Sequence, residues 1–432
     1  MADFNLPKKL LLGSATAATQ IEGGDKNCNW YQWSLDGKVG NGESSLTGAD
    51  HYNRFKEDIN LLAELNQQCY RMSIEWSRIE PSKGKWSSDG IAHYREELSL
   101  LREKGILPLV TLHHFSCPQW FQDKGGWTAD TAVEDFISFC EKVVEEFGDI
   151  VNEWCTINEP NVFANDTYMD GKYPPGHFGD MKSYFKVSRN MVIAHIKAYK
   201  LIHRIRTEKG FSGETAVGFA HHLAYFESSR KGLLASLGRG LITRLFQTVY
   251  FKGMVEGQLI APLGSGYPEG KGCYCDFIGV NYYSRHIITP TLNPGALFGT
   301  IDFDPNVPDE RKNDLGWEIY PPGLYKVIKK CWDKYKLPIH VTENGLPDAD
   351  DGKRASFIRE HLKEVKHLLD DGVDVRRYYY WSLLDNLEWN DGYGPRFGLI
   401  EVDYNTMERH VRPSAEYYAE VCKNHMVKEA IE

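Results

Sequence analysis

Two glutamates stand at the ends of strand-like runs and are the residues best suited to chemistry in this sequence. Glu159 closes the run in "TINEP", and Glu343 closes the run in "VTENG". Two facing carboxyl groups, one protonated and one ionised, are the minimum requirement for hydrolysing a glycosidic bond. Each glutamate could instead pair with a nearby basic residue as part of the fold. The residues alone leave both interpretations open.

These carboxyls can meet only if the fold brings the ends of two distant strands together. Eight runs typical of parallel strands covered on both faces alternate with amphipathic runs typical of helices. The strand candidates span residues 10–17, 69–76, 107–114, 152–158, 215–226, 276–285, 338–343 and 375–384. The clearest helix candidates span residues 54–66, 89–104, 130–147, 183–208, 353–371 and 413–427. The alternation predicts an α/β fold, a single (β/α)8 TIM barrel that forms one catalytic domain over residues 1–432.

Two connections are unusually long and rich in Pro, Gly and Asp, at residues 161–182 and 289–316. Long loops in a compact domain are usually functional or disordered. Because both follow predicted strands, we expect them to extend the C-terminal face of the barrel, where such enzymes place their active sites.

The composition limits the kinds of molecule that the protein is expected to bind. The formal net charge is −10, which argues against nucleic acid or an anionic membrane as the main partner. No run approaches the ~18 apolar residues of a membrane span. The nine cysteines are irregularly spaced, and Cys273-x-Cys275 lacks the further ligands of a zinc site, so reduced thiols in a cytosolic protein are expected. No metal-protease, dinucleotide or P-loop motif occurs, and no metal or cofactor is expected.

Residues 8–24, "KKLLLGSATAATQIEGG", have the outline of a secretory signal peptide, with basic residues, an apolar run and small residues. The apolar run is short, however, and the basic residues lie well inside the chain. We interpret the segment as the first barrel strand, and we therefore expect a cytoplasmic protein.

The chain resembles the family 1 glycoside hydrolases, the β-glucosidase and β-galactosidase family, over nearly its whole length. The nine motifs that carry the resemblance occur in the family's order, and together they are far more specific than any one of them. They are "ATAATQIEGG", "YRMSIEWSRIEP", "TLHHFSCPQW", "TINEP", "GVNYYSR", "GWEIYPPGL", "VTENG", "WSLLDNLEW" and "RFGLIEVDY".

The resemblance implies catalytic roles position by position. Glu159 would be the general acid/base and Glu343 the nucleophile of a retaining enzyme, with the carboxyls about 5–5.5 Å apart. Glu159 would then need a raised pKa, while Glu343 must stay ionised. Arg71 would hold Glu343 as a carboxylate, Tyr283 would donate a hydrogen bond to it, and Asn158 would bind the sugar 2-hydroxyl.

The resemblance also implies a substrate pocket. It assigns the sugar hydroxyls to Gln20, His114, Glu388 and Trp389, the stacking floor to Trp381, the aglycone side to Trp317, and a further substrate contact to Phe397. The remaining histidines are expected to be core residues with satisfied hydrogen bonds, namely His113, His195, His221 and His222.

Three details of the sequence limit what the resemblance implies about the substrate and about the packing of the site. The family's 6-phosphosugar branch has serine where this chain has Glu388, which would repel a phosphate, so an unphosphorylated substrate is expected. The plant thioglucosidases have glutamine where this chain has Glu159, so O-glycosides are expected. The family often has Trp-Asp where Phe115 and Ser116 stand, which puts the packing beside His114 in doubt.

The sequence therefore predicts a retaining exo-β-glycosidase that removes terminal β-D-glucosyl residues, and with them β-D-galactosyl or fucosyl residues, from O-glycosides or short oligosaccharides. Transglycosylation shares the covalent intermediate and stays open. The alternative is a catalytically weak sugar-binding or regulatory protein on the same barrel, which the presence of both glutamates disfavours. A homo-oligomer is compatible with the sequence.

Overall fold

A computed structural model describes residues 3–429 of the chain. Eight strands, all parallel to their neighbours, close into a barrel in the order β11-β12-β2-β3-β4-β5-β6-β8. The barrel strands are β2 (Leu11–Ala15), β3 (Cys69–Ser73), β4 (Leu107–Thr111), β5 (Glu153–Asn158), β6 (Ala216–His222), β8 (Phe277–Asn281), β11 (Ile339–Asn344) and β12 (Val375–Trp381). The predicted (β/α)8 TIM barrel is confirmed.

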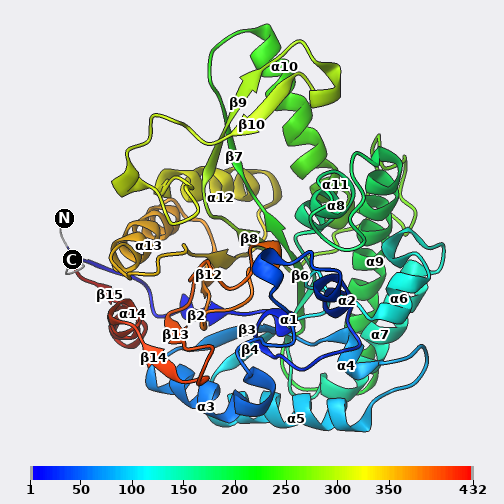
Figure 1. The fold of residues 1–432 in the computed structure, drawn as a ribbon, viewed down its shortest axis with the longest axis vertical. Coiled ribbons are helices and arrows are strands. Elements are labelled where there is room, and N and C mark those ends of the chain that lie inside the picture. The colour runs from blue at the N-terminus through cyan, green and yellow to red at the C-terminus, as the bar shows by residue number, and fades with distance from the viewer. Residues whose placement is uncertain (1–2, 430–432) are drawn as a thin grey trace.

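Helices surround this barrel, and one large helix follows each strand (Figure 1). The larger helices are α3 (His51–Glu64), α5 (Ser88–Glu103), α7 (Ala132–Phe147), α9 (Met181–Glu208), α10 (Leu233–Thr243), α12 (Pro321–Tyr335), α13 (Arg354–Asp370) and α14 (Pro413–Asn424). The short helices are α1 (Ala18–Ile21), α2 (Asn29–Leu35), α4 (Trp76–Ile79), α6 (Gln119–Asp123), α8 (Pro160–Tyr168) and α11 (Val249–Met254).

The core has two parts. A large cluster of buried apolar side chains lies between the barrel and its helices, because the helices turn their apolar faces inward. A smaller cluster contains one or two residues from most barrel strands, including Ala15, Leu109, Cys155 and Phe277, and fills the barrel interior. The barrel is therefore a packed core, open only at the face where its loops gather.

Three pairs or groups of strands lie outside the barrel. They are β1 (Phe4–Asn5) with β15 (Met426–Val427), β13 (Ile400–Val402) with β14 (Arg409–Val411), and a sheet of β7 (Tyr225–Ser228), β9 (Arg285–Pro290) and β10 (Gly299–Asp302). In Figure 1 that last sheet projects from the ring of helices together with α10.

The structure corrects the sequence analysis at three places. The predicted strand 215–226 divides into β6 and β7, because the chain leaves the barrel after His222. The segment 289–316, predicted as a loop, contains β10 and the end of β9. The segment 161–182, also predicted as a loop, begins with α8, whose first residue is Pro160, a favoured residue at that position. Within residues 3–429 no helix is long and apolar enough to cross a membrane.

Candidate active site

Glu159 and Glu343 both lie at the C-terminal ends of barrel strands. Glu343 belongs to β11, and Glu159 follows β5 directly and caps the start of α8. Glu159 has φ 42° and ψ 60°, a left-handed conformation that costs a residue with a Cβ roughly 1–2 kcal/mol. Its backbone N–H donates to the carbonyl of Ala220 (2.8 Å), which holds this turn in place. Strained backbone of this kind is concentrated at functional sites.

The last residue of "VTENG", Gly345, is glycine for a steric reason. A Cβ on Gly345 would lie 1.8 Å from the carbonyl oxygen of Trp381, which is closer than any real contact. Only glycine lets the end of β11 pass so close to the end of β12. The motif thereby brings Glu343 to the same end of the barrel as Trp381.

Arg71 of β3 is fully buried and ties Glu343 of β11 to β4 and β5 across the barrel. Its Nη1 is 2.5 Å from Glu343 Oε1, and its Nη2 donates to Asn158 Oδ1 (2.6 Å). Its Nε donates to Thr111 Oγ1 (3.1 Å). Tyr283 donates its hydroxyl to the other carboxylate oxygen of Glu343, Oε2 (2.6 Å). Glu343 thus accepts a hydrogen bond on each oxygen, as expected for a group held as a carboxylate.

Glu159 is connected to the same network through a second amide. Asn281 Nδ2 donates to Glu159 Oε1 (2.8 Å) and to Asn158 Oδ1 (3.0 Å). Thr342 in turn donates its hydroxyl to Asn281 Oδ1 (2.6 Å), which fixes the orientation of the Asn281 amide. A chain of hydrogen bonds therefore joins the two glutamates beneath the open end of the barrel.

Burial is the main influence on the ionisation of Glu343. It raises the pKa of Glu343 to about 7, against the opposing positive charge of Arg71, while the charge of Glu159 raises it further. The prediction that Glu343 is ionised in the free enzyme therefore holds only above about pH 7.

A cavity of about 260 Å³ opens over the two glutamates. It is lined by most of the predicted site residues, namely His114, Asn158, Glu159, Tyr283, Trp317, Glu343, Trp381, Glu388, Trp389 and Phe397. Arg71 and Gln20 are not among the lining residues: Arg71 lies under Glu343, and Gln20 is fully buried in α1. The structure thus gathers side chains from seven of the nine motifs around one cavity and supports them from the other two.

Three polar atoms of the predicted sugar pocket are buried without a hydrogen-bond partner among the described residues. They are Gln20 Oε1, Glu388 Oε2 and His114 Nδ1. Since buried polar atoms are nearly always satisfied, these atoms indicate a polar ligand. The rings of Trp381 and Trp389 lie nearly parallel to the His114 ring, at 5.7 and 6.0 Å, so apolar surface adjoins the unpaired atoms. This mixture suits a sugar ring, which has both hydroxyls and an apolar face.

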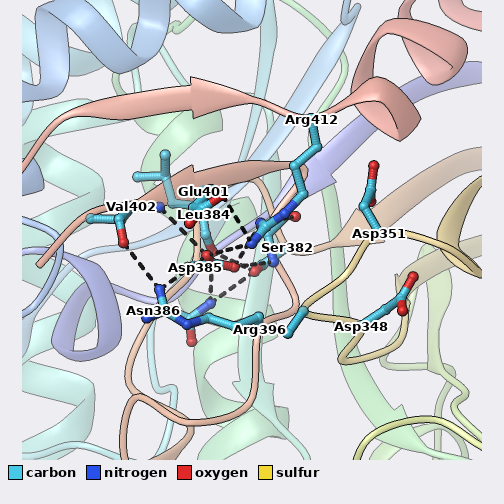
Figure 2. A network of polar contacts seen from close by, with 12 residues as sticks. Asp348, Asp351, Ser382, Leu384, Asp385, Asn386, Arg396, Glu401, Val402 and Arg412 are labelled. Atoms are coloured by element: carbon cyan, nitrogen blue, oxygen red, sulfur yellow. Dashed lines mark hydrogen bonds and ion pairs between the residues drawn. The ribbon is translucent and has the colours of Figure 1, made fainter.

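The segment that carries Glu388 is anchored by a buried ion pair, which Figure 2 shows from close by. Asp385 accepts two hydrogen bonds from Arg412 (3.0 Å each) and one from Arg396 (3.2 Å). The next residue, Asn386, accepts a hydrogen bond from Gln20 Nε2 (2.9 Å). The network therefore fixes Gln20 relative to the segment that carries Glu388.

The aglycone side is formed by aromatic rings. Trp317 lies 5.9 Å from the Tyr283 ring and 6.2 Å from the Phe397 ring, measured between ring centroids, and it is partly exposed.

Eight residues that line the cavity were not predicted, and several come from α8, the connection after it, and the turn after Trp389. They are Phe115, Val162, Asp166, Lys172, Tyr173, His222, Asn390 and Asp391.

Phe115 and Ser116, where the family often has Trp-Asp, are accommodated by their surroundings. The Phe115 ring lies 5.2 Å from the rings of both His114 and Trp389, so it packs directly against the predicted sugar pocket. Ser116 donates its hydroxyl to the buried carboxyl of Glu75 (3.0 Å). His114 therefore keeps its place beside the cavity despite the departure from the family pattern.

Three of the four histidines lie in the core as predicted, and one does not. His113 accepts from Trp127 Nε1 (3.0 Å), His195 lies 2.6 Å from Thr156 Oγ1, and His221 lies 3.2 Å from the Phe246 carbonyl; all three are buried. Only His195 has both ring nitrogens satisfied, because Nδ1 of His113 and of His221 has no partner among the described residues. His222 is different, because it lines the cavity and its Nδ1 lies 3.6 Å from Glu159 Oε1. Alternation along a strand could have revealed it, since neighbours in β6 must point to opposite faces.

The described residues contain no group of three or more His, Cys, Asp or Glu side chains arranged to hold a metal ion. All nine cysteines are free thiols, and Cys273 alone among them is exposed.

Comparison with known proteins shows the family to which the whole chain is similar. The sequence profile described as Glycosyl hydrolase family 1 matches residues 3–427. Beta-glucosidase A of Acetivibrio thermocellus is 33% identical over 450 residues, covering 98% of this chain and 99% of its own. The 1,4-beta-D-glucan glucohydrolase of Thermotoga neapolitana is 33% identical over 447 residues, with coverage of 97% and 98%.

Solved structures agree with these sequence relatives. The beta-glycosidase from Pyrococcus horikoshii superposes with a TM-score of 0.91 at 35% identity, covering 99% of this chain and 97% of that one. The beta-glucosidase from Thermotoga maritima in complex with glucoimidazole superposes with a TM-score of 0.88 at 31% identity, with coverage of 98% and 99%. A match of this extent, on a barrel with this pair of glutamates, shows that the chain belongs to glycosyl hydrolase family 1.

Proposed function

We propose that this enzyme is a retaining exo-β-glycosidase that removes terminal β-D-glucosyl residues from O-glycosides. The observation that carries the proposal is the joint placement of Glu159 and Glu343 at one cavity, with Arg71 and Tyr283 both bound to Glu343. The names of the relatives support glucose as the sugar.

The roles of the two carboxyls follow from their different partners. Arg71 and Tyr283 both donate to Glu343, and donors to a carboxylate favour its ionised form. Glu159 accepts from the neutral amide of Asn281. We therefore assign the attack on the anomeric carbon to Glu343, and the proton for the departing oxygen to Glu159.

The reaction then runs as a double displacement. Glu343 attacks the anomeric carbon as Glu159 gives its proton to the leaving oxygen, so an ester bond forms between sugar and enzyme and the aglycone leaves as an alcohol. Glu159, now ionised, takes a proton from water, and the water oxygen displaces Glu343 from the sugar. We assign the sugar 2-hydroxyl to Asn158, which lines the same cavity. An alcohol in place of water would give transglycosylation.

The substrate is proposed to be unphosphorylated. Glu388 faces the cavity, and Asp391 lies three residues further along the same lining. Burial raises the pKa of Glu388 well above its usual range, and the charge of Asp391 raises it further. Neither carboxyl offers the positive partner that a sugar phosphate needs, and Lys172, the one lysine or arginine among the described lining residues, lies beside Asp170 (3.9 Å). β-D-Galactosides and fucosides are proposed as further substrates, since gluco and galacto sugars differ only at O4.

We also propose that the enzyme works in the cytoplasm. The nine free thiols, eight of them buried, support a reducing compartment. Sequencing the N-terminus of the native protein tests this proposal, because a start beyond Ala18 would show that a leader had been removed.

Azide rescue in two variants tests the assignment of roles. Glu343→Gly should abolish hydrolysis of an aryl β-glucoside, and azide should restore turnover by attacking from the vacated face to give the α-glucosyl azide. Glu159→Gly still forms the glycosyl-enzyme with an activated aryl glucoside, and azide should then give the β-glucosyl azide. The same anomer from both variants would refute the assignment. No turnover by the unaltered enzyme would favour the alternative, a sugar-binding protein.

A further inference from the structure

A second cavity, of about 450 Å³, lies outside the barrel between α10, α11 and α12. It shares no residue with the active-site cavity. Its floor includes Leu223 and Ala224, which follow His222 where the chain leaves β6. The volume falls in the range of about 300–1,000 Å³ that small-molecule sites occupy.

The rim of this cavity is basic. Arg239 from α10 and three lysines of α12 line it, Lys326, Lys330 and Lys334, and no aspartate or glutamate is among the lining residues. This is notable in a chain whose net charge is −10. Glu256 lies outside the lining, with its Oε1 3.6 Å from Lys334 Nζ.

The lysines of α12 are spaced so that they repel one another. Residues four apart lie on the same helix face, where like charges destabilise the helix. Lys329, one residue away, pairs instead with Asp333 (2.6 Å). Among the described residues Lys330 and Arg239 have no hydrogen-bond or ion-pair partner, so their charge is available to an anion.

The floor of the cavity is apolar. Val327 and Cys331, also four apart on α12, are buried, and Phe226 and Phe251 close the cavity from the other side. Lys326 joins the two surfaces, because its Nζ lies 4.4 Å from the centroid of the Tyr225 ring. The cavity thus has an apolar body and a positive mouth.

The wall between α10 and α11 is a π-helical turn, Arg244–Thr248. Such turns are rare and frequently occur at functional sites. Gln247 projects from this turn into the lining and donates to the Ala224 carbonyl (2.7 Å). The turn therefore shapes the wall and fixes the floor of the cavity.

We propose that this cavity binds an amphiphilic anion, a phosphate, sulfate or carboxylate carried on an alkyl or aryl body. The head would lie between Arg239 and Lys330, and the apolar body would cover Val327 and Cys331. A free metabolite and a membrane lipid share this chemistry. The lipid source has structural support, because α10 also carries two exposed leucines, Leu233 (93% exposed) and Leu237 (48%).

Calorimetric titration of the full chain with octyl phosphate, below its micelle concentration, tests the proposal. We expect saturable binding of one molecule, with inorganic phosphate and 1-octanol each at least about tenfold weaker, since each offers one half of the interaction. If inorganic phosphate or 1-octanol bound as tightly as octyl phosphate, the ligand would not need to be amphiphilic and that part of the proposal would be wrong. If octyl phosphate did not bind, the proposal of a binding site would be wrong.

Three variants locate the binding. Arg239→Gln with Lys330→Gln should weaken binding about five- to tenfold, a modest factor because both charges are exposed. Gly240→Leu should abolish it, because Gly240 lines the cavity and an added Cβ there meets nothing within 4 Å. Lys329→Gln is the matched control on α12 and should leave binding unchanged. Full binding by Gly240→Leu, in a variant that still hydrolyses aryl glucosides at the normal rate, would refute the assignment.

Sedimentation with vesicles distinguishes the two sources. If the ligand is a lipid, the unaltered protein should co-sediment with vesicles of phosphatidylcholine that contain phosphatidylglycerol. The Gly240→Leu variant should then stay in the supernatant. Octyl phosphate binding without sedimentation identifies a free amphiphile. Sedimentation that Gly240→Leu does not reduce, with no octyl phosphate binding, would refute the proposal.

Discussion

Tyr283→Phe should move the pH dependence of the reaction without changing the shape of the site. The substitution removes one hydrogen bond, from the Tyr283 hydroxyl to Glu343 Oε2 (2.6 Å), and keeps the ring that packs against Trp317 and Phe397. A bond to an ionised group is worth about 1.5–3 kcal/mol, and a bond to the neutral acid about 1 kcal/mol. Losing the difference, about 1.4 kcal/mol, raises the pKa of Glu343 by about one unit, from about 7 to about 8.

The sign of the effect follows from the role of Glu343. The residue attacks only when ionised, so kcat/KM falls as the pH drops through its pKa, and a raised pKa moves this acid limb to higher pH. The variant should lose about tenfold at pH 6 and almost nothing from this cause at pH 9. A dinitrophenyl β-glucoside is the suitable substrate, because its leaving group needs no proton from Glu159.

Tyr282→Phe is the matched control, since it makes the same change at the adjacent residue. Its hydroxyl donates to the Tyr320 carbonyl (2.6 Å) and not to Glu343, so the acid limb should stay in place even if stability falls. A loss in Tyr283→Phe that is equal at every pH would refute the reasoning, as would a limb that moves to lower pH.

Three further variants test other parts of the structure. Glu159→Ala should slow poor leaving groups at least about 100-fold more than activated ones, measured on a series of aryl glucosides, and a uniform loss would contradict its role as acid. Asp385→Ala leaves the buried Arg412 charge with only the more distant Glu401 as a partner (3.9 Å), and should lower the free energy of unfolding by about 3–5 kcal/mol in a denaturant titration; unchanged stability would show that the pair is not an anchor. Gly345→Ala should destabilise by at least about 1–3 kcal/mol, since its Cβ would overlap the Trp381 carbonyl, and an alanine variant with normal unfolding would contradict that geometry.

The barrel could be predicted because most of its strands are buried on both faces and several leave a near-continuous apolar run. All eight predicted strands contain or nearly match an observed one, from β2 to β12. The outer sheet could not be predicted in the same way. One of its pairings joins distant segments, Tyr225 with Arg285, and this pairing leaves no local pattern in the sequence. The other, Gly299 with Pro290, closes a hairpin within a segment that has no clear run of strand-forming residues.

The site, like the fold, could be predicted from the sequence only in part. Glu159 and Glu343 were recognisable because each ends a strand, and the ends of parallel strands meet at one face. His222 was misassigned because it adjoins His221, and composition cannot tell which of two neighbours faces the cavity. The ionisation of Glu343 was also beyond sequence, because it depends on how burial balances the charge of Arg71.

The exposed thiol of Cys273 gives the molecule a natural point of attachment. Cys273 lies just before β8, and in a barrel of this kind the segments that enter the strands are at the opposite end from the active site. The other eight thiols are buried, so a maleimide should modify one position in the folded protein. An electrode, bead or fluorophore coupled there would leave the cavity facing the solution, and the enzyme would be oriented on a surface without any engineered residue.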